Sequence, residues 1–182
     1  MNRKKLLYLV QTAMLLALLV ALQALTRPFG QMVTGSCVNG ILALGTLLIG
    51  VGSGAVVGLI SPVMAFLLGI APNVVTVPVI MAGNLVYVLL LGFIARRQGR
   101  YGWRLYTGLI CSSIAKFGAL SFLVSQVVCG IAAESLLEQG LLKPPMLAKL
   151  TATFSWPQLF TALIGGGVAV AITPLLRKAL KK

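Results

Sequence analysis

Residues 38–70 read VNGILALGTLLIGVGSGAVVGLISPVMAFLLGI and contain no charged side chain. A transmembrane helix needs about 20 apolar residues, so this stretch is too long for one ordinary span and short for two. The sequence GVGSG at residues 50–54 lies near its middle, and glycine-rich clusters of this kind mark tight reversals. We therefore predict two short helices here, over residues 37–50 and 54–70.

Similar apolar stretches lie on both sides of this segment. They are separated by breaks at residues 27–30, 71–73 and 144–145, each of which contains proline. Proline disfavours helix in the residue before it, so each break ends a helix. The four further helices are predicted over residues 6–26, 74–95, 105–133 and 155–176.

The composition of the whole chain is that of a membrane protein. Its 182 residues are 59% hydrophobic and 9% charged, and its mean hydropathy is +1.03. A soluble domain cannot hide this much apolar surface. We expect an all-α membrane protein that forms a single polytopic domain over residues 1–182. The first apolar stretch follows basic residues, as in a signal peptide, but its length and lack of a cleavage site favour a retained span.

The positive charges indicate how the helices are oriented. The formal net charge is +13, and most of the fifteen cations lie at the ends of apolar stretches, in clusters at residues 3–5, 96–104 and 177–182. The positive-inside rule places all three clusters in the cytoplasm, next to anionic lipid head groups. An even number of spans must then separate the first two clusters, and four fits. Six transmembrane helices with both termini cytoplasmic is the consistent solution, and this charge placement argues against a nucleic-acid partner.

The chain lacks the side chains that most catalytic and metal sites need. It has no histidine, its only carboxylates are Glu134 and Glu138, and its three cysteines form no CxxC pair. A zinc site and a catalytic triad therefore lack their residues. The sequence also contains no Walker A motif. We expect no enzyme activity, no metal and no cofactor. A proton-coupled transporter normally carries an acidic residue or a histidine within a span, and the predicted spans contain neither.

One cation, Lys116, lies inside a predicted span, at residues 105–133. At 1.5 Å per residue it is roughly 18 Å from the cytoplasmic start of that helix, near the bilayer midplane. An ionisable group at that depth is costly and usually faces a cavity or a partner. The alternative is a lysine that snorkels toward the interface or is satisfied by helix carbonyls.

Four more side chains are predicted to share the outer half of the bundle with Lys116: Asn84, Gln126, Trp156 and Gln158. On an ideal helix Lys116 and Gln126 are about 80° apart, close enough to border one cavity. A few polar groups in an apolar pocket are typical of a small-molecule site. Simpler explanations remain open, namely a cross-helix hydrogen bond for Asn84, an interfacial position for Trp156 and a solvated first turn for Gln158.

The first predicted helix, at residues 6–26, carries a row of small residues among leucines. Ala13, Ala17 and Ala21 recur every fourth residue, and each step turns about 400°, so they project on nearly one face. In lipid, small residues at this spacing let another helix come close. That helix belongs either to this chain or to a partner subunit.

Taken together, these features resemble the substrate-binding S components of the energy-coupling factor (ECF) vitamin transporters of prokaryotes. The resemblance covers essentially the whole chain. It rests on the length, the topology, the segment TAMLLALLVALQ at residues 12–23 with its AxxxA spacing, and the closing SWPQLFTALIGGGVAVAITPLLRKALKK at residues 155–182.

The resemblance implies a high-affinity subunit that binds a vitamin or related small nutrient in the prokaryotic plasma membrane. Its partners would be a membrane coupling subunit and two ABC-type ATPases, and it would deliver substrate by toppling in the bilayer. The three alanines of the first helix would face the coupling subunit. The five side chains proposed above for the outer cavity would hold the substrate, under a lid at about residues 27–39.

Two other functions stay open. One is a small transporter or channel subunit outside the ECF class, which would oligomerise through its glycine faces. The other is a structural membrane protein without a ligand, and a cavity in the outer half of the bundle would argue against it. If a ligand binds, Lys116 and the lack of carboxylates in the predicted spans favour a neutral or anionic compound.

Overall fold

The computed structural model of the protein describes residues 2–71, 73–97 and 103–180, and within these ranges every regular element is a helix. The elements, in chain order, are α1 (Arg3–Thr26), η1 (Arg27–Phe29), α2 (Gln31–Leu44), η2 (Gly45–Ile49), α3 (Val51–Leu67), α4 (Thr76–Arg97), α5 (Trp103–Phe122), η3 (Leu123–Ile131), α6 (Ala133–Glu138), α7 (Pro144–Thr153) and α8 (Trp156–Leu180). This confirms the all-α prediction.

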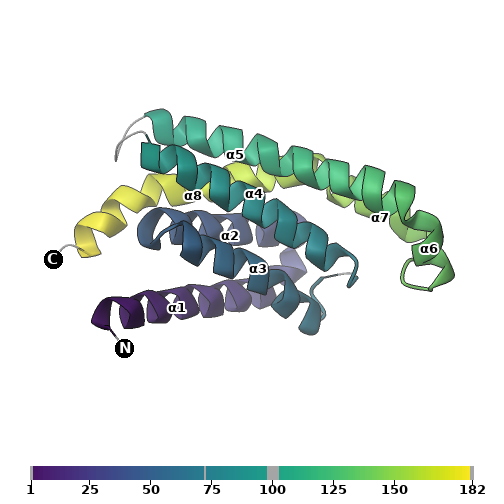
Figure 1. Ribbon diagram of the computed structural model, residues 1–182, viewed down its shortest axis with the longest axis horizontal. Coiled ribbons are helices and arrows are strands. Elements are labelled where there is room, and N and C mark those ends of the chain that lie inside the picture. The colour runs from purple at the N-terminus through teal and green to yellow at the C-terminus, as the bar shows by residue number, and fades with distance from the viewer. Residues whose placement is uncertain (1, 72, 98–102, 181–182) are drawn as a thin grey trace.

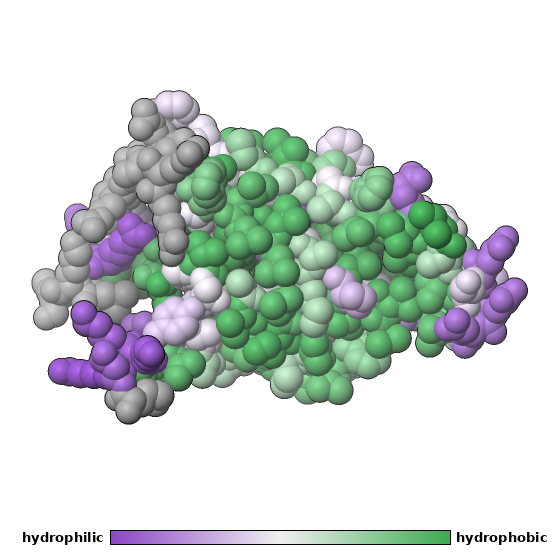
Figure 2. Space-filling model, viewed as in Figure 1, coloured by the Kyte–Doolittle hydropathy of each residue, from purple (hydrophilic) through white to green (hydrophobic). Residues whose placement is uncertain are grey.

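Within the residues that the structure describes, five helical stretches are long and apolar enough to cross a membrane. They are Arg3–Phe29, Gln31–Ile49, Thr76–Ala95, Leu105–Ile131 and Pro144–Ala179. Together with the shorter apolar helix α3, 17 residues long, they are consistent with a bundle of about six membrane helices. Figure 2 shows apolar side chains over the middle of one face and hydrophilic side chains gathered at its two ends, the pattern of a bundle that crosses a bilayer.

The two ends of the bundle carry different elements. In Figure 1 the N- and C-terminal ends lie at one end, with the adjoining ends of α4 and α5, whereas α6 lies at the opposite end. This agrees with the even number of spans predicted between the basic clusters, and that this end is cytoplasmic stays a prediction from the positive-inside rule. Of the cluster at residues 96–104, residues 98–102 lie outside the described residues.

The long uncharged segment divides at Gly50, as its glycines predict. Helix η2 ends at Ile49 and α3 begins at Val51. Gly50 has a φ of 141°, a backbone conformation that side-chain-bearing residues rarely adopt. The reversal therefore depends on glycine.

The segment after α1 differs from its predicted form as a loop. Helix α2 begins at Gln31 rather than near residue 37, so most of the expected lid at residues 27–39 is helical. The short turn η1 contains Pro28, and Gly30 follows with a φ of 84°. These two residues complete the reversal within a few positions, which leaves the rest of the segment free to join the helix.

The last third of the chain also contains structure that was not predicted. Helix α5 continues into a π-helical segment, η3, over Leu123–Ile131. Two short helices, α6 and α7, then fill the outer connection to α8, and Pro144 lies in the first turn of α7, where its missing N–H has no helical partner to lose.

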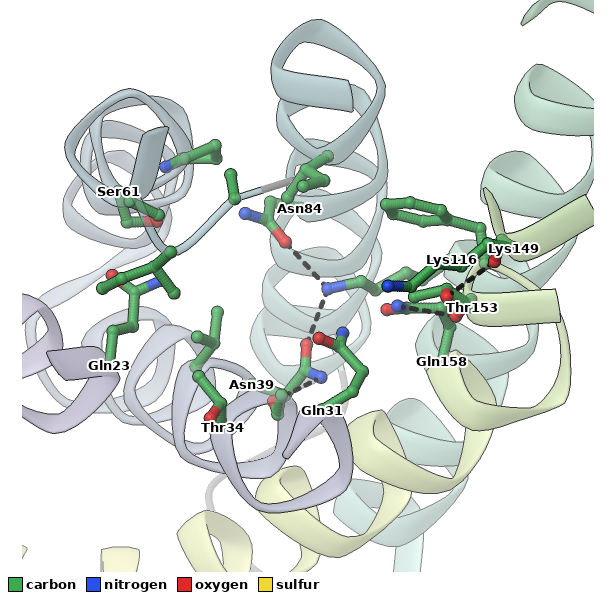
Figure 3. A pocket seen from close by; sticks show the side chains of 18 residues that line it. Gln23, Gln31, Thr34, Asn39, Ser61, Asn84, Lys116, Lys149, Thr153 and Gln158 are labelled. Atoms are coloured by element: carbon green, nitrogen blue, oxygen red, sulfur yellow. Dashed lines mark hydrogen bonds between the residues drawn. The ribbon is translucent and has the colours of Figure 1, made fainter. Parts of the chain in front are cut away.

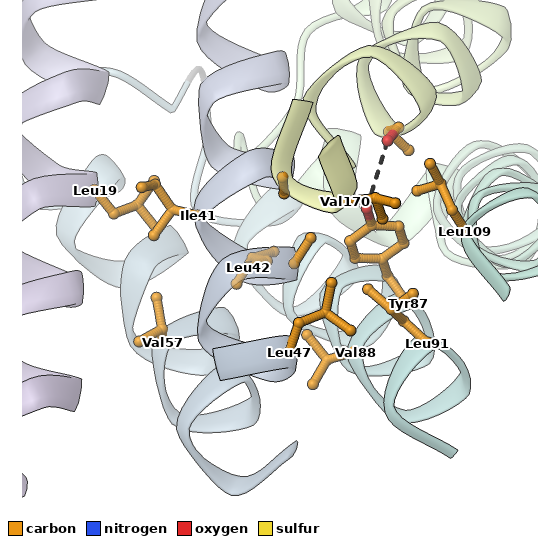
Figure 4. Packing of buried hydrophobic residues seen from close by; sticks show 13 residues of the cluster. Leu19, Ile41, Leu42, Leu47, Val57, Tyr87, Val88, Leu91, Leu109 and Val170 are labelled. Atoms are coloured by element: carbon orange, nitrogen blue, oxygen red, sulfur yellow. Dashed lines mark hydrogen bonds between the residues drawn. The ribbon is translucent and has the colours of Figure 1, made fainter. Parts of the chain in front are cut away.

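The core of the bundle lies where α2, α4 and α8 meet (Figure 4). Leu42, Tyr87 and Leu91 are fully buried, and the Tyr87 hydroxyl donates to the Ala162 carbonyl at 3.4 Å. Helices α2 and α8 approach so closely that their backbones touch. A Cβ atom on Gly165 would overlap the Ser36 carbonyl oxygen of α2. Small residues permit such close contact between membrane helices. The contact matters because helices in lipid have no hydrophobic drive to associate and depend on close packing instead.

We predict that Gly165→Ala destabilises the protein by roughly 1–3 kcal/mol, because the new methyl group would overlap backbone atoms that cannot rotate away. Its matched control is Gly167→Ala in the same helix, where a methyl group meets no atom within 4 Å. Thermal unfolding in detergent measures the difference. Equal midpoints for the two variants would contradict the close contact between α2 and α8.

Candidate ligand-binding pocket

A cavity of about 250 Å³ lies among the helices, with Gln23 near the end of α1 and Gln31 at the start of α2 in its lining. In Figure 1 these helix ends lie away from the end of the bundle that holds the termini. Seven helices line the cavity: α1, α2, α3, α4, α5, α7 and α8. Its polar lining residues, drawn in Figure 3, are Gln23, Gln31, Thr34, Asn39, Ser61, Asn84, Lys116, Lys149, Thr153 and Gln158. Its size is just below the roughly 300–1,000 Å³ of pockets for drug-sized ligands, so it has room for a small molecule only.

Lys116 of α5 is the central polar group of the cavity. Its Nζ donates hydrogen bonds to Asn39 Oδ1 and Asn84 Oδ1, both at 2.7 Å. It also lies 5.5 Å from the centroid of the Tyr87 ring. The side chain is 2% exposed and ends inside the bundle, not at the bilayer interface.

The two asparagines are held in place by neighbouring helices. Asn39 Nδ2 donates to the Gly35 carbonyl at 2.9 Å and to Thr161 Oγ1 at 3.2 Å. Asn84 Nδ2 donates to the Gly58 carbonyl of α3 at 3.0 Å. With each amide nitrogen anchored in this way, each amide oxygen points to the lysine. The ammonium group is therefore fixed before any ligand arrives.

No anionic side chain neutralises Lys116 in the part of the chain that the structure describes. The two carboxylates, Glu134 and Glu138, belong to α6 and are exposed. An unpaired charge in a low-dielectric interior is costly. An ammonium group has three N–H donors, and the two asparagines use two of them. The third donor makes no hydrogen bond with a described residue, and the charge has the Tyr87 ring rather than an anion beside it. A second cation, Lys149 of α7, lines the same cavity.

The cavity brings together three of the five predicted substrate residues, Asn84, Lys116 and Gln158. Asn84 lines the cavity and also makes a cross-helix hydrogen bond, to Gly58 of α3, which was the simpler explanation for this residue. Gln158 is 6% exposed, and its Nε2 donates to the Thr153 carbonyl at 3.2 Å. It is not a solvated first-turn residue. The role of all three in binding stays a prediction.

The other two predicted residues lie outside the cavity. Gln126 is exposed. Its predicted position assumed a regular α-helix, but it lies in the π-helical segment η3, where each turn holds more residues, so its direction changes. Trp156 is 62% exposed and stacks on Phe117, with ring centroids 5.3 Å apart. Its position fits the interfacial aromatic that was its alternative explanation.

Several lining residues were not predicted, including Gln23, Asn39, Ser61 and Lys149. Gln23 and Ser61 are polar residues within apolar stretches, and that signal, which identified Lys116, would have found them as well. Asn39 was placed in the lid. Lys149 lies on α7, a helix that the sequence analysis did not predict.

The alanines of α1 are on the surface of the described structure. Ala13, Ala17 and Ala21 are all exposed. They are therefore not explained by packing within this chain, and their contact with a partner stays a prediction.

The sequence as a whole matches one protein family. The family described as ECF transporter, substrate-specific component, matches residues 7–177. The chain therefore belongs to the substrate-specific components of ECF transporters, which are multi-pass membrane proteins that bind substrate and are not enzymes. Membership implies a substrate and a coupling module with ATPases. Comparisons with curated proteins and with solved structures found no match.

Proposed function

We propose that the chain is the high-affinity subunit for a vitamin or related small nutrient, and that the cavity around Lys116 is its substrate site. The observation that carries this proposal is a buried ammonium group, preorganised by Asn39 and Asn84, that lines a cavity and has no carboxylate partner in the described residues. A bound anion or carbonyl would stabilise it.

The position of the cavity supports a route of transport into the cell. Its lining includes Gln23 and Gln31, at helix ends away from the basic termini, so substrate would enter from outside. The sequence has no Walker A motif, so energy would come from two partner ATPases. Docking through the exposed alanines of α1 would then let the loaded subunit topple and release substrate to the cytosol of a prokaryotic cell.

The glycines argue against the alternative of a channel subunit that oligomerises through glycine faces. A Cβ atom on Gly58 would contact Asn84, and one on Gly83 would overlap Leu120. These glycines are already used for packing between helices of the same chain. The cavity, in turn, argues against a structural protein without a ligand.

Native mass spectrometry of the purified protein tests the proposed function directly. High-affinity binding predicts that a small molecule remains bound after purification from cells grown in rich medium. Because the cavity has cations and no acidic side chain among the described residues, we expect a compound without net positive charge. Recovery of a cationic vitamin, such as protonated thiamine, would contradict this expectation, and protein that retains no compound would count against high-affinity binding.

A further inference from the structure

Apart from the polar group around Lys116, the cavity has a polar wall formed by Gln23 of α1 and Ser61 of α3. Gln23 is 6% exposed and Ser61 is 0% exposed. Gln23 Oε1 and Ser61 Oγ make no hydrogen bond with any residue that the structure describes. Buried polar atoms are nearly always bonded, and each one left without a partner costs about 1–3 kcal/mol.

This wall is unusual within the described structure. Only three side-chain polar atoms there are buried without a partner, and two of them belong to residues that line this one cavity. The third, Ser113 Oγ, belongs to a residue that does not line it. Both residues line this one cavity, although the two atoms themselves are closed off from it, so a molecule in the cavity could serve as their partner once the Gln23 amide and the Ser61 hydroxyl rotate toward it.

Polar side chains lie on opposite sides of the cavity. Figure 3 shows Gln23 and Ser61 on one side, Lys149 and Gln158 on the other, and Lys116 between them. The remaining lining side chains are mostly apolar, among them Val38, Ala65 and Ile80. A ligand that fills this space meets a positive charge at one part and neutral hydrogen-bonding groups at another.

Building on the proposed function, we infer that the ligand is a small anion with two distinct polar groups. A carboxylate or phosphate binds Lys116, and a hydroxyl or amide group binds Gln23 and Ser61. The Gln23 carboxamide oxygen needs a donor, and the Ser61 hydroxyl can donate or accept. A hydroxyl or an amide offers both a donor and an acceptor, so it satisfies both side chains.

The inference also assigns a binding role to helices outside the expected set. The five side chains predicted to hold the substrate belong to the spans predicted at residues 74–95, 105–133 and 155–176. Here α1 and α3 contribute the wall that recognises the neutral group, so selection between similar anions depends on Gln23 and Ser61. Lys116 binds the anionic group that such compounds share.

The experiment compares Gln23→Met and Ser61→Ala with two matched controls. Gln11→Met changes the same residue type on α1 outside the cavity, and Ser113→Ala removes a buried, unpartnered hydroxyl that does not line it. The probe is the compound released from the wild-type protein, identified by accurate mass and fragmentation and then titrated by calorimetry. Its mass also tells a phosphate from a carboxylate.

We expect the released compound to carry an anionic group and a hydroxyl or amide. Gln23→Met and Ser61→Ala should each weaken its binding roughly 3- to 10-fold, the usual range for one hydrogen bond. The two controls should bind it like the wild type. Without ligand, Ser61→Ala should unfold at or above the wild-type midpoint, because it removes a buried group that has no partner.

Three results would overturn the inference. A released compound that lacks either polar group would do so and leave the proposed function intact. Equal affinities for the cavity variants and their controls would also do so, because Gln23 and Ser61 would then be hydrated and not bound by the ligand. A wild-type protein that retains no compound would count against the proposed function itself, and the inference would fall with it.

Discussion

Lys116→Ala is expected to weaken substrate binding by roughly 1.5–3 kcal/mol, which is about 10- to 150-fold in the dissociation constant. Nζ is fixed by Asn39 and Asn84 and faces the cavity with its charge unpaired among the described residues. A carboxylate, phosphate or carbonyl of the ligand would lose a charge-assisted hydrogen bond. Titration calorimetry on the purified protein measures the change.

The variant needs controls because the lysine also bonds two asparagines. Its loss leaves two amide oxygens without a donor, so ligand-free stability must be measured together with affinity. Lys116→Met keeps the length of the side chain and removes the charge. Lys143→Ala removes an exposed lysine that does not line the cavity. Unchanged affinity in both Lys116 variants would make the lysine a structural residue.

A second measurement separates a binding role of Lys116 from a purely structural one. It compares the affinity for the anionic ligand with the affinity for an uncharged analogue, because a structural lysine would not change which of the two binds more tightly. We expect the wild type to bind the anionic ligand more tightly than an amide analogue of the same compound. In Lys116→Met that preference should disappear, because the two compounds differ only in charge at the group that the lysine binds.

The helical architecture could be predicted because long uncharged stretches, glycine clusters and basic clusters are all evident in the sequence itself. The glycines at residues 50–54 and the uncharged length around them predicted two helices, and the structure divides this segment at Gly50, between η2 and α3. The basic clusters predicted the parity of the spans. The outer elements α6 and α7 were missed because they are too short for an apolar repeat to stand out, and the π-helical segment η3 has no compositional signal.

The site was predicted only in part because sequence position gives depth along a helix more reliably than direction around it. Lys116, Asn84 and Gln158, which were predicted to share one cavity, all line it. Gln126 was also placed in the outer half, but the wider turns of η3 point it elsewhere. Gln23 was not among the predicted site residues, and it lies on the helix that was predicted to contact a partner. Contact between helices far apart in sequence, such as α1 and α3, becomes evident only in the folded structure.

Ala17→Trp is expected to abolish uptake into cells while the purified protein still binds its substrate. Ala17 is exposed at the centre of the row formed with Ala13 and Ala21. An indole there would keep a partner helix from coming close, since small residues are what permit backbone approach in lipid. Uptake of labelled substrate and calorimetric binding are measured on the same variant.

Binding should survive although α1 also contributes Gln23 to the cavity. The step from Ala17 to Gln23 is six residues, which leaves the two side chains about 120° apart around the helix. Gln23 is buried and Ala17 is exposed, so the indole extends away from the cavity.

Leu18→Trp is the control for the effect of a large ring on α1. Leu18 is the next residue, 48% exposed, and already bulky, and it lies about 100° from Ala17 around the helix. It should support normal uptake, which would show that the block depends on the alanine face. If Ala17→Trp loses binding together with uptake, the alanine is needed for the fold of this subunit. If uptake is unchanged, the row faces lipid and the coupling subunit docks elsewhere.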